Sequence, residues 1–162
     1  MSPQSRPGTL VGMEWVDEGL EILSEDECRA LLAMVNVGRL AVALGDVPLV
    51  VPVNYGLIDG DVVFATGEGT KLRTALEKAL VAFEVDEIDE LAEVGWSVLF
   101  VGHAREVVDP DELARVQGLG VRSWVSEGRD HWVRIERSFV SGRRIVSGTA
   151  NAELGAESAS DL

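Results

Sequence analysis

The sequence predicts a mainly β protein, a small antiparallel β-barrel of six strands with a few short flanking helices. Six segments rich in β-branched and aromatic residues follow one another after residue 38. The joints between neighbouring segments hold turn residues, among them Gly45-Asp46 and Asp59-Gly60. An antiparallel sheet of this size must also hide its edges, and closure into a barrel does so most completely.

The chain is long enough for one folded unit, and no linker or internal repeat divides it. At 162 residues it can bury a large core without a disulfide or a metal ion. Residues 1–15 and the small, acidic stretch over residues 147–162 lack hydrophobic periodicity, so we expect both to be flexible. We therefore expect one domain over residues 16–146.

A helix is expected near the start of this domain, over about residues 23–35. Ser24 can cap it, and Glu27, three residues further on, can complete a capping box. The apolar positions have the i, i+3, i+4, i+7 spacing of one buried face: Cys28, Leu31, Leu32 and Val35. The place of Cys28 on this face predicts a packed, reduced thiol rather than a nucleophile.

The expected strands cover residues 39–44, 49–58, 61–66, 81–85, 96–108 and 132–146. Two further helices are expected between strands, over residues 70–80 and 110–118. The second has Asp109 as its cap and Pro110 in its first turn. A two-sheet sandwich is the alternative architecture, but sandwich chains seldom place a capped helix between adjacent strands.

The composition argues against several classes of function. A formal net charge of −14 opposes binding to the phosphate backbone of nucleic acids. No apolar run approaches the roughly 18 residues of a membrane span, and the first residues do not have the pattern of a secretion signal. The single cysteine cannot form an internal disulfide. We therefore expect a cytoplasmic protein.

Common catalytic and metal-binding motifs are missing from the sequence. His103 and His131 are the only histidines, and neither stands at a metal-ligand spacing from the other or from Cys28. The sequence has no Gly-x-Ser-x-Gly elbow, no Walker motif and no Gly-x-Gly-x-x-Gly after a strand. We expect no metal centre and no catalytic side-chain set, so a redox cofactor would have to be held in another way.

The most informative stretch is residues 64–73, FATGEGTKLR, which lead from a strand through a two-glycine loop to a helix start. Free amide groups at a helix start point toward a bound anion. Thr66 and Thr70 can add hydroxyl donors, and Lys71 adds a positive charge. Without an anion, a lysine there opposes the helix dipole. The stretch favours a phosphate site, and an ordinary surface loop is the alternative.

Seven short fragments occur in order between residues 23 and 145. They are VGRL at 37–40, VPVNY at 51–55, DG at 59–60, VFAT at 63–66, GTKL at 69–72, VAFEVD at 81–86 and GWSV at 95–98. In this order and spacing they resemble the pyridoxamine 5'-phosphate oxidase-like family of FMN-binding split β-barrels. The likeness is greatest to its small actinobacterial-type and nitroimidazole-resistance-like members.

The resemblance implies a homodimer with one FMN in each of two grooves between the subunits. It implies that the flavin ring lies along one strand, at Pro52, Val53, Asn54 and Tyr55. It also places Thr66 near the ribityl chain or the phosphate, and the phosphate itself at Thr70 and Lys71. For Val53, a plain place in the barrel core is the alternative.

Two further groups of residues complete the site that the resemblance implies. Trp96 and Ser97 stand at the start of the long strand that closes the groove, although Trp96 could equally be barrel core. Trp124 and His131 would lie near the partner subunit's flavin, in a stretch that also holds Arg122, Arg129 and Asp130. For the charged members of that stretch, a solvated surface loop is the favoured alternative.

The function that the resemblance implies is a flavin-dependent oxidoreductase acting on an unknown small-molecule acceptor. True pyridoxamine phosphate oxidation is not expected, because a low-complexity tail follows Arg143-Arg144 where the vitamin-pathway enzyme has a substrate-binding motif. Related barrels hold the deazaflavin coenzyme F-420 or haem in similar grooves. The alternatives are therefore a non-enzymatic protein that binds or sequesters flavin, deazaflavin or haem, and a structural barrel with an empty groove.

Overall fold

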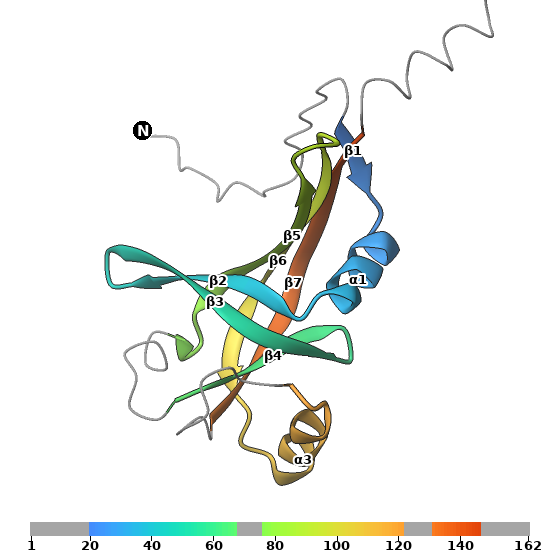
Figure 1. Ribbon diagram of the computed structural model, residues 1–162. Coiled ribbons are helices and arrows are strands. Elements are labelled where there is room, and N and C mark those ends of the chain that lie inside the picture. The colour runs from blue at the N-terminus through green and yellow to red at the C-terminus, as the bar shows by residue number, and fades with distance from the viewer. Residues whose placement is uncertain (1–19, 68–75, 122–130, 147–162) are drawn as a thin grey trace, which may run out of the picture.

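The computed structural model describes residues 20–67, 76–121 and 131–146. Within these ranges the elements follow in the order β1 (Leu20–Leu23), α1 (Glu25–Met34), β2 (Val37–Leu44), β3 (Val47–Ile58), β4 (Asp61–Thr66), β5 (Leu80–Asp89), β6 (Val94–Glu106), α3 (Pro110–Gly118) and β7 (His131–Ile145). Figure 1 shows α1 beside β7 and α3 at the lower end of the barrel.

The strands form one antiparallel sheet that closes on itself. The hydrogen-bonded order is β1-β7-β4-β3-β2-β5-β6, and β6 also pairs with β7. Six strands, β2 to β7, therefore form a closed cycle, as the sequence predicts. The seventh, β1, pairs only with the end of β7, from Leu20 opposite Ile145 to Leu23 opposite Gly142.

The short strand β1 is not predicted from the sequence. Leu23 is buried but Glu21 and Ile22 are exposed, so this segment has no alternating pattern. The other strand boundaries differ by up to four residues from the predicted ones, and the longest extensions occur where backbone pairing continues past the apolar positions. The strand β5, for example, continues to Asp89 through exposed residues that still pair with β6.

Two predicted turns connect antiparallel neighbours as expected. Asp59 and Gly60 have φ angles of 53° and 85°, and they join β3 to β4. Positive φ at both central residues is typical of the hairpin turn that Asp-Gly favours. The turn between β2 and β3 has Gly45 at a φ of 63°. Figure 1 shows this hairpin extending beyond the barrel at the left of the view.

The helix α1 begins as predicted and covers one part of the barrel. Its capping box is formed, because the Ser24 amide donates to Glu27 Oε2 at 2.9 Å and the Ser24 hydroxyl accepts from the Glu27 amide. Cys28, Leu31 and Leu32 are buried on the barrel side. Burial raises the pKa of the Cys28 thiol, which agrees with the predicted packed cysteine. The helix ends at Met34, one residue earlier than expected.

The helix predicted over residues 70–80 extends too far at its end. Residues 68–75 lie outside the described part of the chain, but Glu77 and Lys78 form a turn and β5 begins at Leu80. Lys78 has a φ of 56°, which breaks a helix. The helical periodicity suggests a helix as far as residue 80, but the β-rich Leu80–Val85 segment already forms a strand from Leu80.

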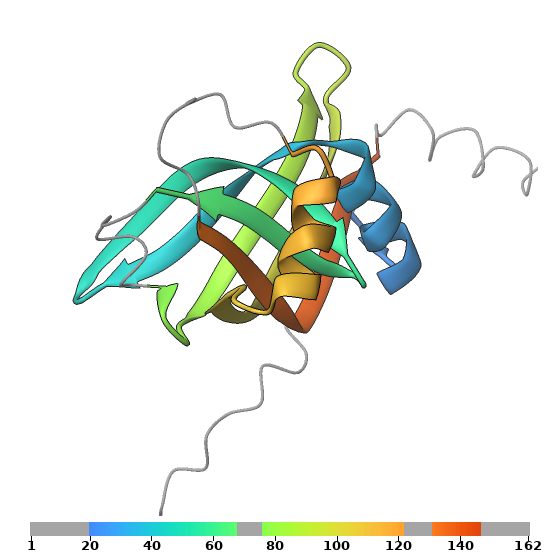
Figure 2. The ribbon, with the colours of Figure 1, turned by 90° about the horizontal axis from the view of Figure 1, so that it is seen from below.

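The interior of the barrel is filled by alternate residues of the six strands. Those with no exposed surface include Leu40, Phe64, Phe83, Phe100 and Ile135. A second, smaller cluster lies under α3 and consists of Ile58, Val63, Val107, Val116 and Trp132. Figure 2 shows α3 in front of the barrel strands and α1 to its right. No helix within the described ranges is long and apolar enough to cross a membrane.

Candidate functional site

The predicted flavin-contacting strand is the second half of β3, and its side chains alternate between two faces. Pro52 is exposed and Asn54 is half-buried, whereas Val53 and Tyr55 belong to the barrel core. The Tyr55 hydroxyl donates to the Leu32 carbonyl at 2.5 Å, and burial raises the pKa of this phenol. Of these four residues, only Pro52 and Asn54 therefore present side chains on the outer face of the barrel.

A pocket of about 480 Å³ adjoins this strand where it passes Asn54. Its walls come from the end of α1, the start of β2, the second half of β3 and the residues after α3. The lining residues are Leu32, Ala33, Val35, Asn36, Val37, Asn54, Tyr55, Gly56, Leu57, Leu119, Gly120 and Val121. We call it the β3 pocket. Two of the predicted site residues, Asn54 and Tyr55, line it.

Gly56 allows the segment after α3 to form one wall of the β3 pocket. A Cβ atom at this position would lie 2.8 Å from Val121 Cγ2 and 3.2 Å from Leu119 Cδ1. A larger residue would therefore force the Val121 and Leu119 side chains to shift away from β3. This wall was not predicted from the sequence, although an isolated glycine inside a strand pattern is a recognised sign of close approach by another segment.

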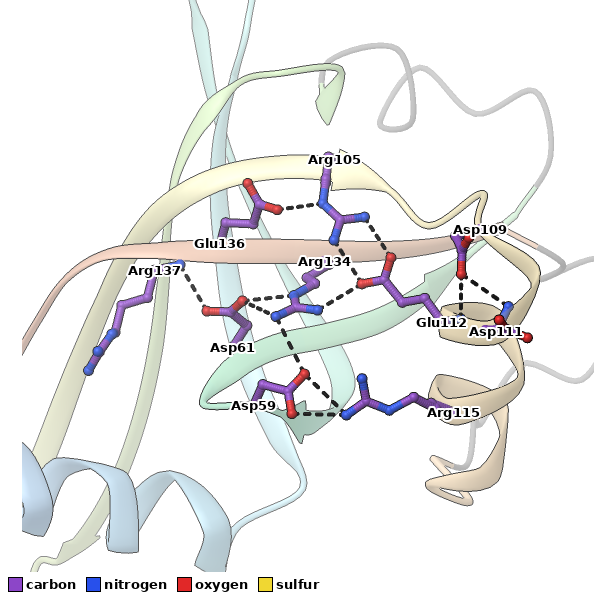
Figure 3. A network of polar contacts seen from close by, with 10 residues as sticks. All are labelled: Asp59, Asp61, Arg105, Asp109, Asp111, Glu112, Arg115, Arg134, Glu136 and Arg137. Carbon is purple, nitrogen blue, oxygen red and sulfur yellow. Dashed lines mark hydrogen bonds and ion pairs between the residues drawn. The ribbon is translucent and has the colours of Figure 1, made fainter.

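An ion-pair network ties α3 to the barrel and so fixes this wall (Figure 3). Glu112 of α3 accepts hydrogen bonds from Arg105 at 2.7 and 2.9 Å and from Arg134 at 2.8 Å. Arg134 in turn contacts Asp61 at 2.6 Å. The Arg105 guanidinium, together with that of Arg134, lowers the pKa of Glu112 to about 2. The carboxylate is therefore ionised at any physiological pH.

Two other predicted site residues, Thr66 and His131, are neighbours at one end of the barrel. They face each other in the β4–β7 ladder, and Thr66 is only 4 % exposed. His131 Nδ1 lies 2.5 Å from Glu106 Oε1. Thr66 shares the inner face of β4 with Phe64, so it does not lie on the same face as Pro52. A ligand that contacts both must pass the end of β4.

Trp96 and Ser97 lie at the opposite end of the β6–β7 ladder from His131. Trp96 is opposite Arg144, whereas the His131 end of β7 pairs with the last residues of β6. Trp96 packs against the core and also lines a second cavity of about 540 Å³, together with Glu87 and Asp89. Within one chain, the structure therefore does not bring Trp96 or Ser97 to the β3 pocket or to Thr66.

Arg39 is a charged residue of the outer face that the sequence analysis does not single out as a site residue. It is opposite Pro52 in the β2–β3 ladder, and it contacts Asp86 at 2.5 Å and Glu84 at 3.1 Å. Burial, together with the charge of Asp86, raises the pKa of Glu84. These contacts place a fixed cation and two carboxylates beside the exposed part of β3.

Three predicted site residues, Thr70, Lys71 and Trp124, lie outside the described residues. The same holds for the charged residues Arg122, Arg129 and Asp130. The phosphate site and the contribution of the 122–130 stretch therefore remain predictions from the sequence.

The sequence model of the family described as pyridoxamine 5'-phosphate oxidase matches residues 24–144. This match covers most of the chain. The protein belongs to the pyridoxamine 5'-phosphate oxidase family. The match includes every described element except β1 and the last residue of β7, so the family pattern spans the whole closed barrel.

Relatives within this family support the assignment. The uncharacterized protein Rv0080 of Mycobacterium tuberculosis is 37 % identical over 152 residues, which are 91 % of this chain and 97 % of that protein. The structure of an FAD binding protein from Mycobacterium smegmatis matches with a TM-score of 0.69 and 37 % identity. It covers 78 % of this chain and all of the other. An FAD-binding protein from Mesorhizobium loti has a TM-score of 0.62 and 26 % identity, over 79 % of this chain and 98 % of the other.

Proposed function

We propose that the protein is an FMN-dependent oxidoreductase that acts on a small-molecule acceptor and works as a homodimer. A bound flavin would supply the hydride or electron transfer, while the protein binds and orients the reactants. The observation that carries the proposal is the outer strip of β3, where Pro52 and Asn54 are accessible beside the β3 pocket. We also propose a cytoplasmic location, which the free and buried Cys28 supports.

The residues around β3 fit the chemistry of a flavin. An isoalloxazine ring has an apolar benzenoid end and a polar edge of carbonyl and N–H groups. Pro52 offers an apolar surface, and the Asn54 amide can both donate and accept hydrogen bonds. We assign the phosphate to the segment that follows Thr66, which contains Thr70 and Lys71. The M. smegmatis and M. loti relatives that bind FAD support a flavin, and FMN is the flavin that the family resemblance implies.

The outer face also supports the proposed dimer. One row of residues crosses five neighbouring strands in register and is apolar throughout: Val50, Ala41, Ala82, Val101 and Phe139. Val50 is 61 % exposed and Phe139 is 48 % exposed. The next row contains Pro52 and Arg39. A second copy on this face would cover the apolar row and approach the β3 strip, and its Trp96 and Ser97 could then complete the groove.

The dimer can be tested with a charge in the apolar row. We expect Phe139→Lys to be monomeric, because a lysine within a closely packed apolar interface loses hydration without a partner. Sedimentation velocity measures the change. The control is Leu91→Lys, since Leu91 is 99 % exposed at the β5–β6 turn and stands outside the row. A wild-type protein that sediments as a monomer would contradict the proposal.

The cofactor can be tested at the predicted phosphate site. We expect Lys71→Ala to weaken FMN binding by about 1–3 kcal/mol, roughly 5- to 150-fold, because it removes a charge-assisted contact. Fluorescence titration with FMN measures the affinity. Lys78→Ala is the matched control, since Lys78 is exposed in the turn before β5. Equal affinities for wild type and Lys71→Ala would reject the phosphate assignment, and a purified protein that shows a haem spectrum and does not bind FMN would reject the flavin.

A further inference from the structure

The β3 pocket continues the proposed flavin strip at the end away from the phosphate segment. The strand β4 runs antiparallel to β3, and Tyr55 pairs with Phe64. From Phe64 to Thr66 the chain therefore runs along β3 in the direction of Pro52. The pocket instead runs forward from Asn54 to Leu57. It therefore lies where a reactant could meet the ring edge, and it shares Asn54 and Tyr55 with the end of the strip that the ring itself would cover.

The described walls of the pocket carry no formal charge. Every lining residue within the described ranges is neutral, and the side chains among them that can form hydrogen bonds are Asn36, Asn54 and Tyr55. The Tyr55 hydroxyl already donates to the Leu32 carbonyl. The two carboxamides therefore provide the polar groups, and each of them can donate and accept. The remaining lining is aliphatic side chain and backbone.

This lining selects against charged ligands. An ion that enters loses part of its hydration, and no lining side chain compensates for that loss with an opposite charge. The net charge of −14 also repels anions in general. A neutral ring with an amide-type edge loses little free energy when it moves from water into the pocket, since its donors and acceptors can form hydrogen bonds with the two asparagines. A volume of about 480 Å³ accommodates such a compound.

We propose that the β3 pocket is the acceptor site and that it takes uncharged ring compounds with an amide-type edge. The proposal rests on the proposed function for its role in turnover, whereas the expected selectivity follows from the described lining residues. The wall at Leu119 and Val121 sets the width of the pocket, because it is held by α3 on one side and by contact with Gly56 on the other.

The first test uses two probes of nearly equal shape, nicotinamide and nicotinate, which differ by one negative charge. We expect nicotinamide to bind at least tenfold more tightly than nicotinate in isothermal titration calorimetry. The measurement is made on FMN-loaded protein and repeated on flavin-free protein. Equal affinities for the two probes would overturn the proposal, and so would no binding of nicotinamide at its highest soluble concentration.

The second test places a cation in the wall. Leu119 is 41 % exposed directly after α3, so Leu119→Lys should fold normally. We expect it to reverse the preference, with nicotinate gaining at least tenfold in affinity relative to nicotinamide. Gln117→Lys adds the same charge to an exposed residue that does not line the pocket, and it should leave the preference unchanged. An unchanged preference in Leu119→Lys would place the probe elsewhere and overturn the proposal.

A third variant tests the carboxamides. Asn54→Leu keeps the size of the side chain but removes its amide, which would also face the flavin, so this variant is measured on flavin-free protein. We expect nicotinamide affinity to fall about three- to tenfold, the usual value of one neutral hydrogen bond. Unchanged affinity would rule out Asn54 as the recognising group. If FMN titration fails but the nicotinamide preference is present in flavin-free protein, the proposed function fails while the selectivity of the pocket stands.

Discussion

Replacement of Gly102 by alanine is expected to destabilise the protein by about 3 kcal/mol, at the upper end of the cost of overpacking a core. A Cβ atom at this position would lie 2.1 Å from the Glu136 carbonyl oxygen and 2.9 Å from Ile135 Cγ2. The nearest atom belongs to the backbone of the paired strand, so no side-chain rotation can relieve the overlap. The register between β6 and β7 also shifts between Val101 and Gly102, which fixes this close approach.

Urea unfolding of Gly102→Ala, followed by circular dichroism, measures the loss of stability. A loss of this size corresponds to a decrease in Tm of roughly 10 °C for a chain of this length. The control is Gly118→Ala, because an added Cβ at the end of α3 meets no atom within 4 Å. Alanine favours helix over glycine, so this variant should be unchanged or slightly more stable. Equal stability of the two variants would contradict the expected strain at Gly102.

The barrel was predictable because its signals are local. Each hairpin has either a strong turn pair, such as Asp59-Gly60, or an alternating apolar pattern that ends at polar residues. The capping box of α1 requires only Ser24 and Glu27, three residues apart. The strand β1 could not be predicted in the same way, since its formation depends on pairing with the end of β7, more than a hundred residues further along the chain.

The site was only partly predictable, because its parts come from segments distant in sequence. The resemblance identified β3 from its own motif, and the structure places Asn54 and Tyr55 at a pocket. The wall at Leu119–Val121 was missed, because it depends on the position of α3 in space. Trp96 and His131 also lie at opposite ends of the β6–β7 ladder. The order of motifs along the sequence does not show whether two such residues meet in space.

Glu112→Gln is the second variant with a large expected effect. Glu112 holds α3 in position through a largely buried carboxylate that contacts two arginines. The side chain of Glu112 is only 15 % exposed and accepts from both Arg105 and Arg134. Glutamine keeps the shape but leaves two guanidinium groups without this counter-charge. We expect a loss of about 3 kcal/mol at neutral pH, in the range for breaking a largely buried ion pair. Urea unfolding at pH 7 measures it.

The pH dependence separates this effect from a simple packing defect. The arginines lower the pKa of Glu112 in the folded protein to about 2, from a value of 4.5 in the unfolded chain. Its contribution is therefore complete above pH 4.5 and is lost as the pH falls toward 2, because the unfolded chain binds a proton at this carboxylate over that range while the folded protein does not. The stability difference between wild type and Glu112→Gln should shrink over this window.

The matched control for this prediction is Glu136→Gln, on the other side of Arg105. Glu136 contacts the Arg105 Nε at 2.6 Å, but its side chain is 53 % exposed, so water screens the pair. We expect this variant to cost less than about 1 kcal/mol. A difference between wild type and Glu112→Gln that stays constant down to low pH would show that the charge of Glu112 does not hold α3. In that case the apolar cluster around Val116 would account for the position of the helix and of the pocket wall.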